Sequence, residues 1–193
     1  MRCINKVFAK ICNFFTDFVK RDKKNIKKEV KMTAFVWDVA INTTLKFEGG
    51  YVNDLRDSGG ETNFGISKKA YPNLDIKALS IDDAKKIYKR DYWDRCKCNF
   101  IPDALSIALF DFAVNSGCNR AIRYLQRALG ITIDGKIGNQ TIGACNSIPV
   151  KETLEKFIIY RLEYLMSLKA WKYYGNGWGA RVKSIQSICE KYL

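Results

Sequence analysis

Two carboxyl side chains flank a glycine-rich stretch near the first third of this chain. Glu48 directly precedes Gly49-Gly50, and Asp57 and Thr62 follow within the next fourteen residues. Two carboxyls that face one cleft suit glycosidic hydrolysis, because one protonates the leaving oxygen and the other handles water or the oxocarbenium charge. The spacing therefore makes Glu48 and Asp57 candidate catalytic residues.

The neighbouring residues predict the elements that hold these carboxyls. A helical pattern of apolar residues stops at the glycine pair, because glycine takes positive φ at little cost and ends helices. Tyr51–Val52 and Phe64–Ile66 predict two short strands around a turn at Asp57–Gly60. Glu48 is then at a helix C-terminus, which favours its protonated form, and Asp57 is on a hairpin that folds back over it. The same pieces also occur as an ordinary helix end and an ordinary turn.

The stretch resembles the peptidoglycan muramidases of glycoside hydrolase family 108. It shares their Glu48-Gly-Gly-Tyr start and their Asp57-x-Gly-Gly-x-Thr62-x-x-Gly-Ile continuation, and it is similar to the Glu…Asp…Thr triad of phage lysozymes. The similarity runs from about Met32 onward, and one departure is Leu55, where the family often has proline. The resemblance implies a lysozyme-like fold and an enzyme that needs no cofactor.

The resemblance also implies the reaction and the roles. The expected substrate is peptidoglycan, cut at the β-1,4 bond between N-acetylmuramic acid and N-acetylglucosamine. Glu48 would be the general acid, while Asp57 polarises and Thr62 positions the attacking water, an arrangement that favours inversion. A lytic transglycosylase acting on the same bond is the alternative enzyme. A non-catalytic protein that binds the wall or assists export is the alternative outside enzymes.

Further residues are predicted to bind substrate. Aromatic faces pack on sugar rings, and amide or guanidinium groups bond to hydroxyl and acetamido groups, although tryptophan is often a core residue instead. The predicted substrate-binding residues are Tyr51, Asn53, Asn63, Tyr92, Trp93, Asn115, Trp178 and Arg181. Asp111 is one helical turn from Asn115 and is predicted to line the cleft or to support the active-site helix.

Composition excludes several kinds of chemistry. The 193 residues include no histidine, which removes every Ser-His and Cys-His nucleophile scheme. The seven cysteines are scattered and form no Cys-x-x-Cys pair, so buried free thiols are expected rather than a zinc site. Asp54 and Asp57 lack the alternating ligands of a calcium loop. We expect no metal.

Charge is concentrated at the N-terminus. The chain carries +13 in all, and residues 1 to 32 contribute +7 of it through ten Lys and Arg against three Asp and Glu. Apolar residues recur there at helical spacing, from Ile4 to Val19. Residues 1–31 therefore form either an interfacial helix and linker for an anionic membrane, a helix packed on the domain, or an extension from an upstream start codon. No motif for specific nucleic-acid binding is visible.

The remaining pattern is mostly helical. Helices are predicted at about 80–93, 102–116, 120–129, 151–173 and 178–192, with a turn and helix start at Asp134–Thr141. The last motif resembles the signature of peptidoglycan-binding modules. The fold class is mainly α (α+β), a lysozyme-like domain over 32–193 with a small hairpin and a peptidoglycan-binding-like part around 117–193. We expect a monomer, made in the cytoplasm without a conventional signal peptide, that acts on the cell wall.

Overall fold

The computed structural model describes residues 35–53 and 60–193. The chain divides into two compact units, Met1–Asp38 and Val39–Leu193, and the elements discussed below belong to the second, apart from the start of the first helix. That helix covers residues 35–45. No helix among the described residues combines the length and the apolar character that crossing a membrane requires.

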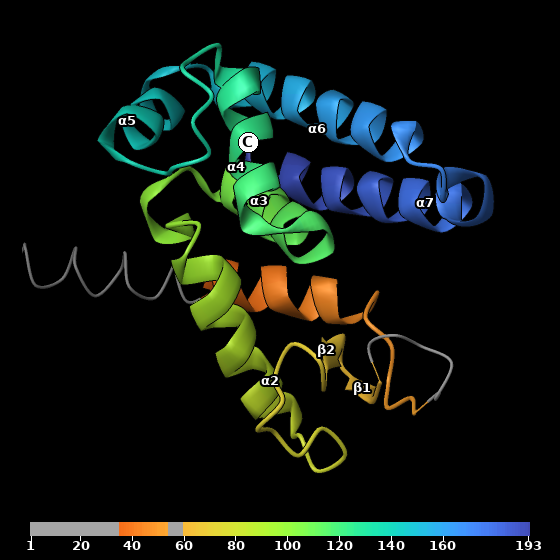
Figure 1. The fold of residues 1–193 in the computed structure, drawn as a ribbon. Helices are drawn as coiled ribbons and strands as arrows, with labels where there is room; N and C mark the ends of the chain where they lie inside the picture. The colour runs from red at the N-terminus through yellow and green to blue at the C-terminus, as the bar shows by residue number, and fades with distance from the viewer. Residues whose placement is uncertain (1–34, 54–59) are drawn as a thin grey trace, which may run out of the picture. The chain divides into compact units, whose positions relative to one another are not determined.

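The fold is mainly α-helical with one small sheet, as predicted (Figure 1). The helices are α2 (Ile81–Tyr88), α3 (Asp103–Ser116), α4 (Cys118–Leu129), α5 (Asn139–Ser147), α6 (Val150–Ser167) and α7 (Trp171–Cys189). A π-helical turn, Lys89–Asp94, continues α2, and short 3-10 turns lie at Cys98–Phe100 and Glu190–Tyr192. The sheet pairs β1 (Thr62–Asn63) with β2 (Ile66–Ser67).

Helix α3 is the centre of the unit Val39–Leu193. Every residue from Ala104 to Ala113 is buried, because this segment is apolar apart from Ser106 and Asp111 and other helices cover it. Helices α4, α6 and α7 all contact α3, and α6 and α7 pack against each other. A core helix of this kind is a rigid base for polar side chains that must keep one position.

Local signals explain several helix ends. The Ser80 side chain accepts a hydrogen bond from the Asp83 backbone N–H at 3.1 Å, so it caps α2 as predicted. Gly130 ends α4 in the left-handed conformation, with φ of 68°. The predicted helix to residue 93 is instead α2 followed by the π-helical turn, which carries Tyr92 and Trp93.

The C-terminal helices differ from the prediction in their bounds. The predicted helix to residue 173 ends at Ser167, because the backbone becomes extended at Leu168. The last helix then begins at Trp171, seven residues earlier than predicted. Gly175 is helical, and an added Cβ would lie 2.7 Å from the Trp171 ring. Close packing of that ring compensates for the low helix propensity of glycine.

The hairpin also differs from the prediction. Its turn is Phe64-Gly65 rather than Asp57–Gly60, and Thr62 faces Ser67 while Asn63 faces Ile66. Both turn residues have positive φ, 50° and 75°, as a two-residue hairpin turn of this hand requires. Val52 pairs with Thr62 through two backbone hydrogen bonds of 2.8 and 2.9 Å. The predicted strand at Tyr51–Val52 therefore does pair with the chain that follows it, but its partner is Thr62 and not Phe64–Ile66.

Candidate active site

Glu48 lies just beyond the first described helix. Turn hydrogen bonds from Lys46 N to Thr43 O and from Phe47 N to Thr44 O close the helix end and aim the next residue back toward α3 and α7. The Glu48 side chain is 18% exposed, so it is mostly enclosed yet reachable from solvent. A general acid requires this combination of partial enclosure and access.

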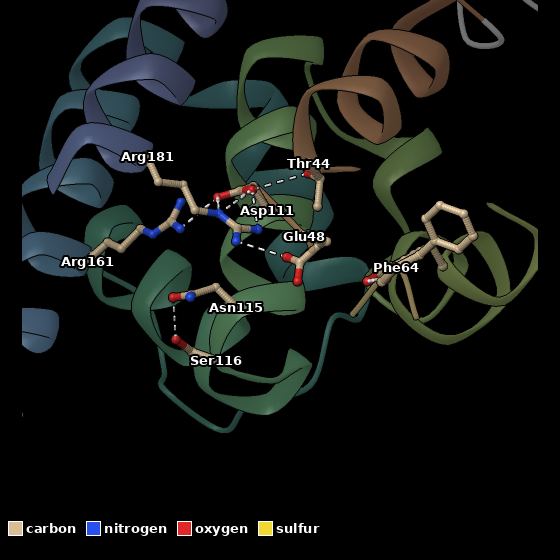
Figure 2. A network of polar contacts seen from close by, with 9 residues as sticks. Thr44, Glu48, Phe64, Asp111, Asn115, Ser116, Arg161 and Arg181 are labelled. Carbon is tan, nitrogen blue, oxygen red and sulfur yellow. Dashed lines mark hydrogen bonds and ion pairs between the residues drawn. The ribbon is translucent and has the colours of Figure 1, made fainter. Parts of the chain in front are cut away.

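Arg181 of α7 holds one side of Glu48. Its Nη1 donates to Glu48 Oε1 at 2.9 Å, and its Nε and Nη2 donate to Asp111 at 3.0 and 2.8 Å (Figure 2). The guanidinium therefore bridges two carboxylates, one buried and one at the surface of the unit. Fork-shaped donors of this kind fix direction as well as distance.

Asp111 anchors this bridge from inside α3. It is fully buried and also accepts hydrogen bonds from Arg161 Nη2 at 2.7 Å and from Thr44 Oγ1 at 3.2 Å. Burial by itself would raise the pKa of Asp111, but the positive charges of Arg161 and Arg181 outweigh it, and the pKa lies below its ordinary value. Asp111 is thus held as a carboxylate.

Arg161 completes the network in the core. Its side chain is 1% exposed, its guanidinium lies 5.1 Å from the centre of the Phe112 ring, and its Nε and Nη1 have no hydrogen-bond partner among the described residues. Two arginines and two carboxylates give this cluster no net charge when Glu48 is ionised. Neutral overall charge makes burial of four charged groups tolerable.

The hairpin turn encloses the other side of Glu48. A Cβ added at Gly65 would lie 2.5 Å from Glu48 Oε2 and 2.7 Å from the Tyr88 hydroxyl, so only glycine allows this approach. Tyr88 donates to the Phe64 carbonyl at 2.7 Å and so ties α2 to the turn. Burial, followed by the nearby negative charge of Glu48, raises the pKa of Tyr88, which keeps its hydroxyl protonated as a donor.

Of the two other predicted catalytic residues, the structure describes Thr62 but not Asp57. Thr62 is on β1, half-buried, three positions before the glycine that touches Glu48. Asp57 lies outside the described residues. The structure therefore brings Thr62 onto the same hairpin that encloses Glu48.

Two predicted substrate-binding residues are exposed beside the hairpin. Tyr51 is 41% exposed and donates its hydroxyl to Glu61 at 2.8 Å. Asn53 is also exposed, next to the Val52 bridge. Both are accessible for contact with a ligand.

Two others face the interior. Asn63 is 6% exposed and donates to the Ile76 carbonyl at 3.2 Å, so it supports the segment before α2. Trp93 is 1% exposed, packs edge-on against Phe110 and donates to Asn99 Oδ1 at 2.6 Å. Stacking on a sugar requires an accessible ring face, which the buried Trp93 does not offer, and the Asn63 side chain donates to the backbone of the segment before α2.

The remaining predicted contacts are half-buried, apart from Arg181. Tyr92 lies beside Tyr88 with ring centres 5.6 Å apart, and Asn115 accepts a hydrogen bond from Ser116 at 3.0 Å. Trp178 stacks on Tyr174. Arg181 is 8% exposed, and each of its three nitrogens bonds to a carboxylate, so the structure shows it as the link between Asp111 and Glu48.

Sequence reasoning missed three members of the network, Thr44, Arg161 and Tyr88. Arg161 occupies a core position on α6, in line with Phe157, Ile158 and Leu165, and a charge inside an apolar stripe is the signal that could have revealed it. Tyr88 gave no such signal, because an aromatic residue on the buried face of a helix is ordinary. For Asp111, the structure supports the alternative in which it stabilises the active site from within.

No group of three or more His, Cys, Asp or Glu in the described ranges is arranged to hold a metal ion. The site just described is therefore built from carboxylates, guanidinium groups and hydroxyls. That set can transfer a proton and stabilise charge at a cleaved bond.

Comparison with known proteins decides the family. The sequence profile of glycosyl hydrolase 108 matches residues 41–117, a range that contains Glu48, the hairpin and all of α3. A solved structure titled "Structure of Brucella abortus SagA" is similar at 30% sequence identity and a TM-score of 0.73, and the alignment covers 81% of this chain and 94% of that one. This chain belongs to glycosyl hydrolase family 108. A search of curated proteins found no match.

Family membership identifies the general chemistry. This family 108 protein is a glycoside hydrolase, and in general terms a peptidoglycan hydrolase. The profile match ends at Gly117, whereas the structural similarity extends over most of the helical part that follows. The Glu48 network draws on both regions, since Arg161 and Arg181 come from helices beyond the profile match.

Proposed function

We propose that this protein hydrolyses the β-1,4 bond between N-acetylmuramic acid and N-acetylglucosamine, with Glu48 as the general acid. The supporting observation is the position of Glu48, half-enclosed between Arg181 and the Gly65 turn. An acid must be held within reach of the leaving oxygen in one orientation, and contacts on both carboxyl oxygens supply that constraint.

The Arg181 bridge is compatible with proton transfer. An ion pair with arginine is formed by the ionised carboxylate, so Glu48 must acquire a proton before it acts as an acid. Arg181 stays in place during this step, because Asp111 holds it through Nε and Nη2 independently of Glu48. After Glu48 has given its proton to the leaving oxygen, its carboxylate again accepts from Arg181 Nη1 at the same position.

Asp57 and Thr62 are proposed to position and polarise the attacking water. Thr62 is supported by its place on the hairpin that covers Glu48. Asp57 is supported by the family motif alone. With water placed between a carboxylate and the sugar, the product should have inverted configuration.

The proposal is tested by incubating the purified protein with purified peptidoglycan and analysing the released ends. Hydrolysis gives reducing muramic acid ends, and the anomer formed first reports inversion or retention. Release of 1,6-anhydromuramic acid would instead establish a lytic transglycosylase. Absence of any cleavage would refute the enzymatic proposal.

A further inference from the structure

A second pocket, separate from Glu48, opens where α3 passes into α4. It has a volume of about 400 Å³. The lining residues are Ser116, Gly117, Asn119, Arg120, Arg123 and Tyr124. Two arginines one turn apart on a helix face give this pocket a positive character.

The first arginine is held at the pocket by two contacts. Arg120 Nη1 donates to the Ser116 carbonyl at 3.0 Å, and its guanidinium lies 4.7 Å from the centre of the Tyr164 ring. A guanidinium has five N–H donors, so most of them stay available after these contacts. The side chain is therefore oriented in advance but not saturated.

The second arginine is oriented through its stem. Gly135, with φ of 75°, packs so closely on α4 that an added Cβ would lie 3.1 Å from Arg123 Cγ and would collide with Asn119 Nδ2. Gln126 fixes this turn, because its side chain accepts from Gly135 N at 2.9 Å and donates to Asp134 at 2.7 Å. The Asp134–Thr141 motif thus supports one wall of the pocket.

Neither arginine is paired with a carboxylate among the described residues. In contrast, Arg90, Arg161 and Arg181 all form ion pairs there with Asp or Glu at 2.9 Å or less. The pocket therefore holds two uncompensated positive charges, and the first turn of α4 adds the partial positive charge of a helix N-terminus. The ligand chemistry that fits is a carboxylate, which arginine binds in bidentate fashion.

The pocket lies along the helix that anchors the Glu48 network. Asp111 and Asn115 are one turn apart on α3, a rise of about 6 Å, and Ser116 at the pocket follows directly. Figure 2 shows Asn115 and Ser116 on the α3 segment below the Arg181–Glu48 pair. A glycan strand bound at Glu48 would have to follow this end of α3 to reach Arg120 and Arg123.

We propose that the Arg120–Arg123 pocket binds a carboxylate of the peptide attached to the muramic acid residue. This inference rests on the proposed function, because muramic acid carries its peptide on the lactyl group of the sugar beside the cleaved bond. The pocket makes the enzyme prefer peptide-bearing glycan strands.

The test compares the Arg120→Gln/Arg123→Gln double variant with the wild-type protein on three substrates. These are intact peptide-bearing strands, the same strands with carboxylates amidated by carbodiimide and ammonia, and strands stripped of peptide by an amidase. We expect the variant to lose about tenfold in kcat/KM on intact strands, as removal of two partly exposed charge-assisted contacts implies. On amidated and stripped strands, variant and wild type should be equal.

Arg127→Gln is the matched control, since Arg127 is on the same helix but stacks on Tyr160 at 3.9 Å outside the pocket. Equal activity of variant and wild type on intact strands would overturn the inference, as would an equal loss on amidated strands. A loss that persists on stripped strands would identify the lactyl carboxylate instead and also overturn it.

Wild-type protein that cleaves no strand would refute the proposed function separately. In that case, binding of a soluble muropeptide tests the pocket. The Arg120→Gln and Arg123→Gln substitutions, added to the Glu48→Gln variant, should weaken this binding, and unchanged binding would overturn the inference.

Discussion

Glu48 and Asp111 are both carboxylates bound to Arg181, yet their surroundings give them different tasks. Asp111 is fully buried and accepts from three side chains, so its charge is fixed. Glu48 accepts a hydrogen bond from only one nitrogen of Arg181, and its side chain is 18% exposed. At the scale of single residues, the site therefore pairs one partly exposed carboxyl, the proposed proton donor, with one buried carboxylate that holds Arg181 in place.

Replacing Glu48 by glutamine should abolish wall lysis while leaving the fold intact. The change keeps the side-chain shape but removes the transferable proton, which should cost about 10²–10⁴ in rate. Turbidity clearing of purified peptidoglycan measures the effect, and Glu163→Gln on the exposed face of α6 is the control. A Glu48→Gln protein that clears at a rate near wild type would disprove the central assignment.

Replacing Asp57 by asparagine should reduce turnover much more than wall binding. Its charge is required chiefly as the attacking water and the oxocarbenium charge develop. Clearing rate and sedimentation with insoluble peptidoglycan separate the two effects. Near-normal turnover would mean that Glu48 works with another carboxyl, and Asp54 is the first candidate.

Replacing Asp111 by asparagine should lower the free energy of unfolding by about 3–5 kcal/mol at neutral pH, because two buried arginines lose their counter-charge. The folded-state pKa of Asp111 is depressed, so its contribution is present above the ordinary value of 3.8 and is lost as pH falls through the folded value. The difference between wild type and variant should thus narrow below about pH 4.

Denaturant unfolding at several pH values measures this effect. Asp103→Asn, on the first turn of the same helix, is the control and should change stability far less, because burial raises the pKa of that carboxyl and no arginine partner holds it. A stability difference for Asp111→Asn that stays constant down to pH 2 would contradict the assignment of its charge.

Among the secondary-structure elements, the hairpin has the strictest requirement for one residue type, which is glycine at position 65. Gly60 and Gly65 both have positive φ, 69° and 75°, but of the two only Gly65 approaches the Glu48 carboxyl. At Gly60 an added Cβ would lie 4.0 Å from Lys68 Cβ, an ordinary contact. Substitutions at the two glycines therefore distinguish the effect of backbone strain, which both positions share, from the effect of contact with Glu48, which applies only at Gly65.

Gly65→Ala should reduce activity at least about tenfold more than Gly60→Ala, although both substitutions carry a similar strain of about 1–2 kcal/mol. The extra methyl group at residue 65 must displace Glu48 Oε2, and a shift of about 1 Å in a catalytic group can cost 10²-fold. Clearing rates and melting temperatures of both variants measure this. Equal loss of activity in the two would show that the turn does not position Glu48.

On the scale of the whole molecule, charge distinguishes the N-terminal segment from the enzyme. Residues 1–32 carry +7, and the remaining residues carry +6 of the total. Residues 1–31 lie outside the described residues, so their role remains a proposal based on charge and on the apolar stripe from Ile4 to Val19.

Deleting residues 1–31 should leave hydrolysis of soluble wall fragments unchanged and weaken binding to anionic vesicles. Basic residues near an anionic surface contribute about 1 kcal/mol each, and that attraction is screened by salt. Co-sedimentation with anionic and neutral vesicles tests the proposal. Equal pelleting of both proteins would refute a membrane role, and a large fall in melting temperature would show that the segment packs on the enzyme.

Much of this protein was predictable from local sequence signals. The helix cap at Ser80, the glycine end of α4 and the mostly apolar α3 each depend on residues within a few positions, and such signals are readable without a fold. Glu48 was identified in the same way, from the glycine pair and the family motif around it. The hairpin turn was predicted at Asp57–Gly60, whereas the structure has it at Phe64-Gly65, where both residues take positive φ.

The tertiary structure alone decided the partners of Glu48. Arg181 is 133 positions away from Glu48 and 70 from Asp111, and Arg161 is 50 from Asp111. No periodicity along the chain encodes such pairings, since they arise when α3, α6 and α7 pack and buried charges must find counter-charges. Burial likewise separated Trp93 and Asn63, which face the core, from Tyr51 and Asn53, which face solvent. Residue type predicts what a side chain is able to bind, whereas packing decides which surface it can reach.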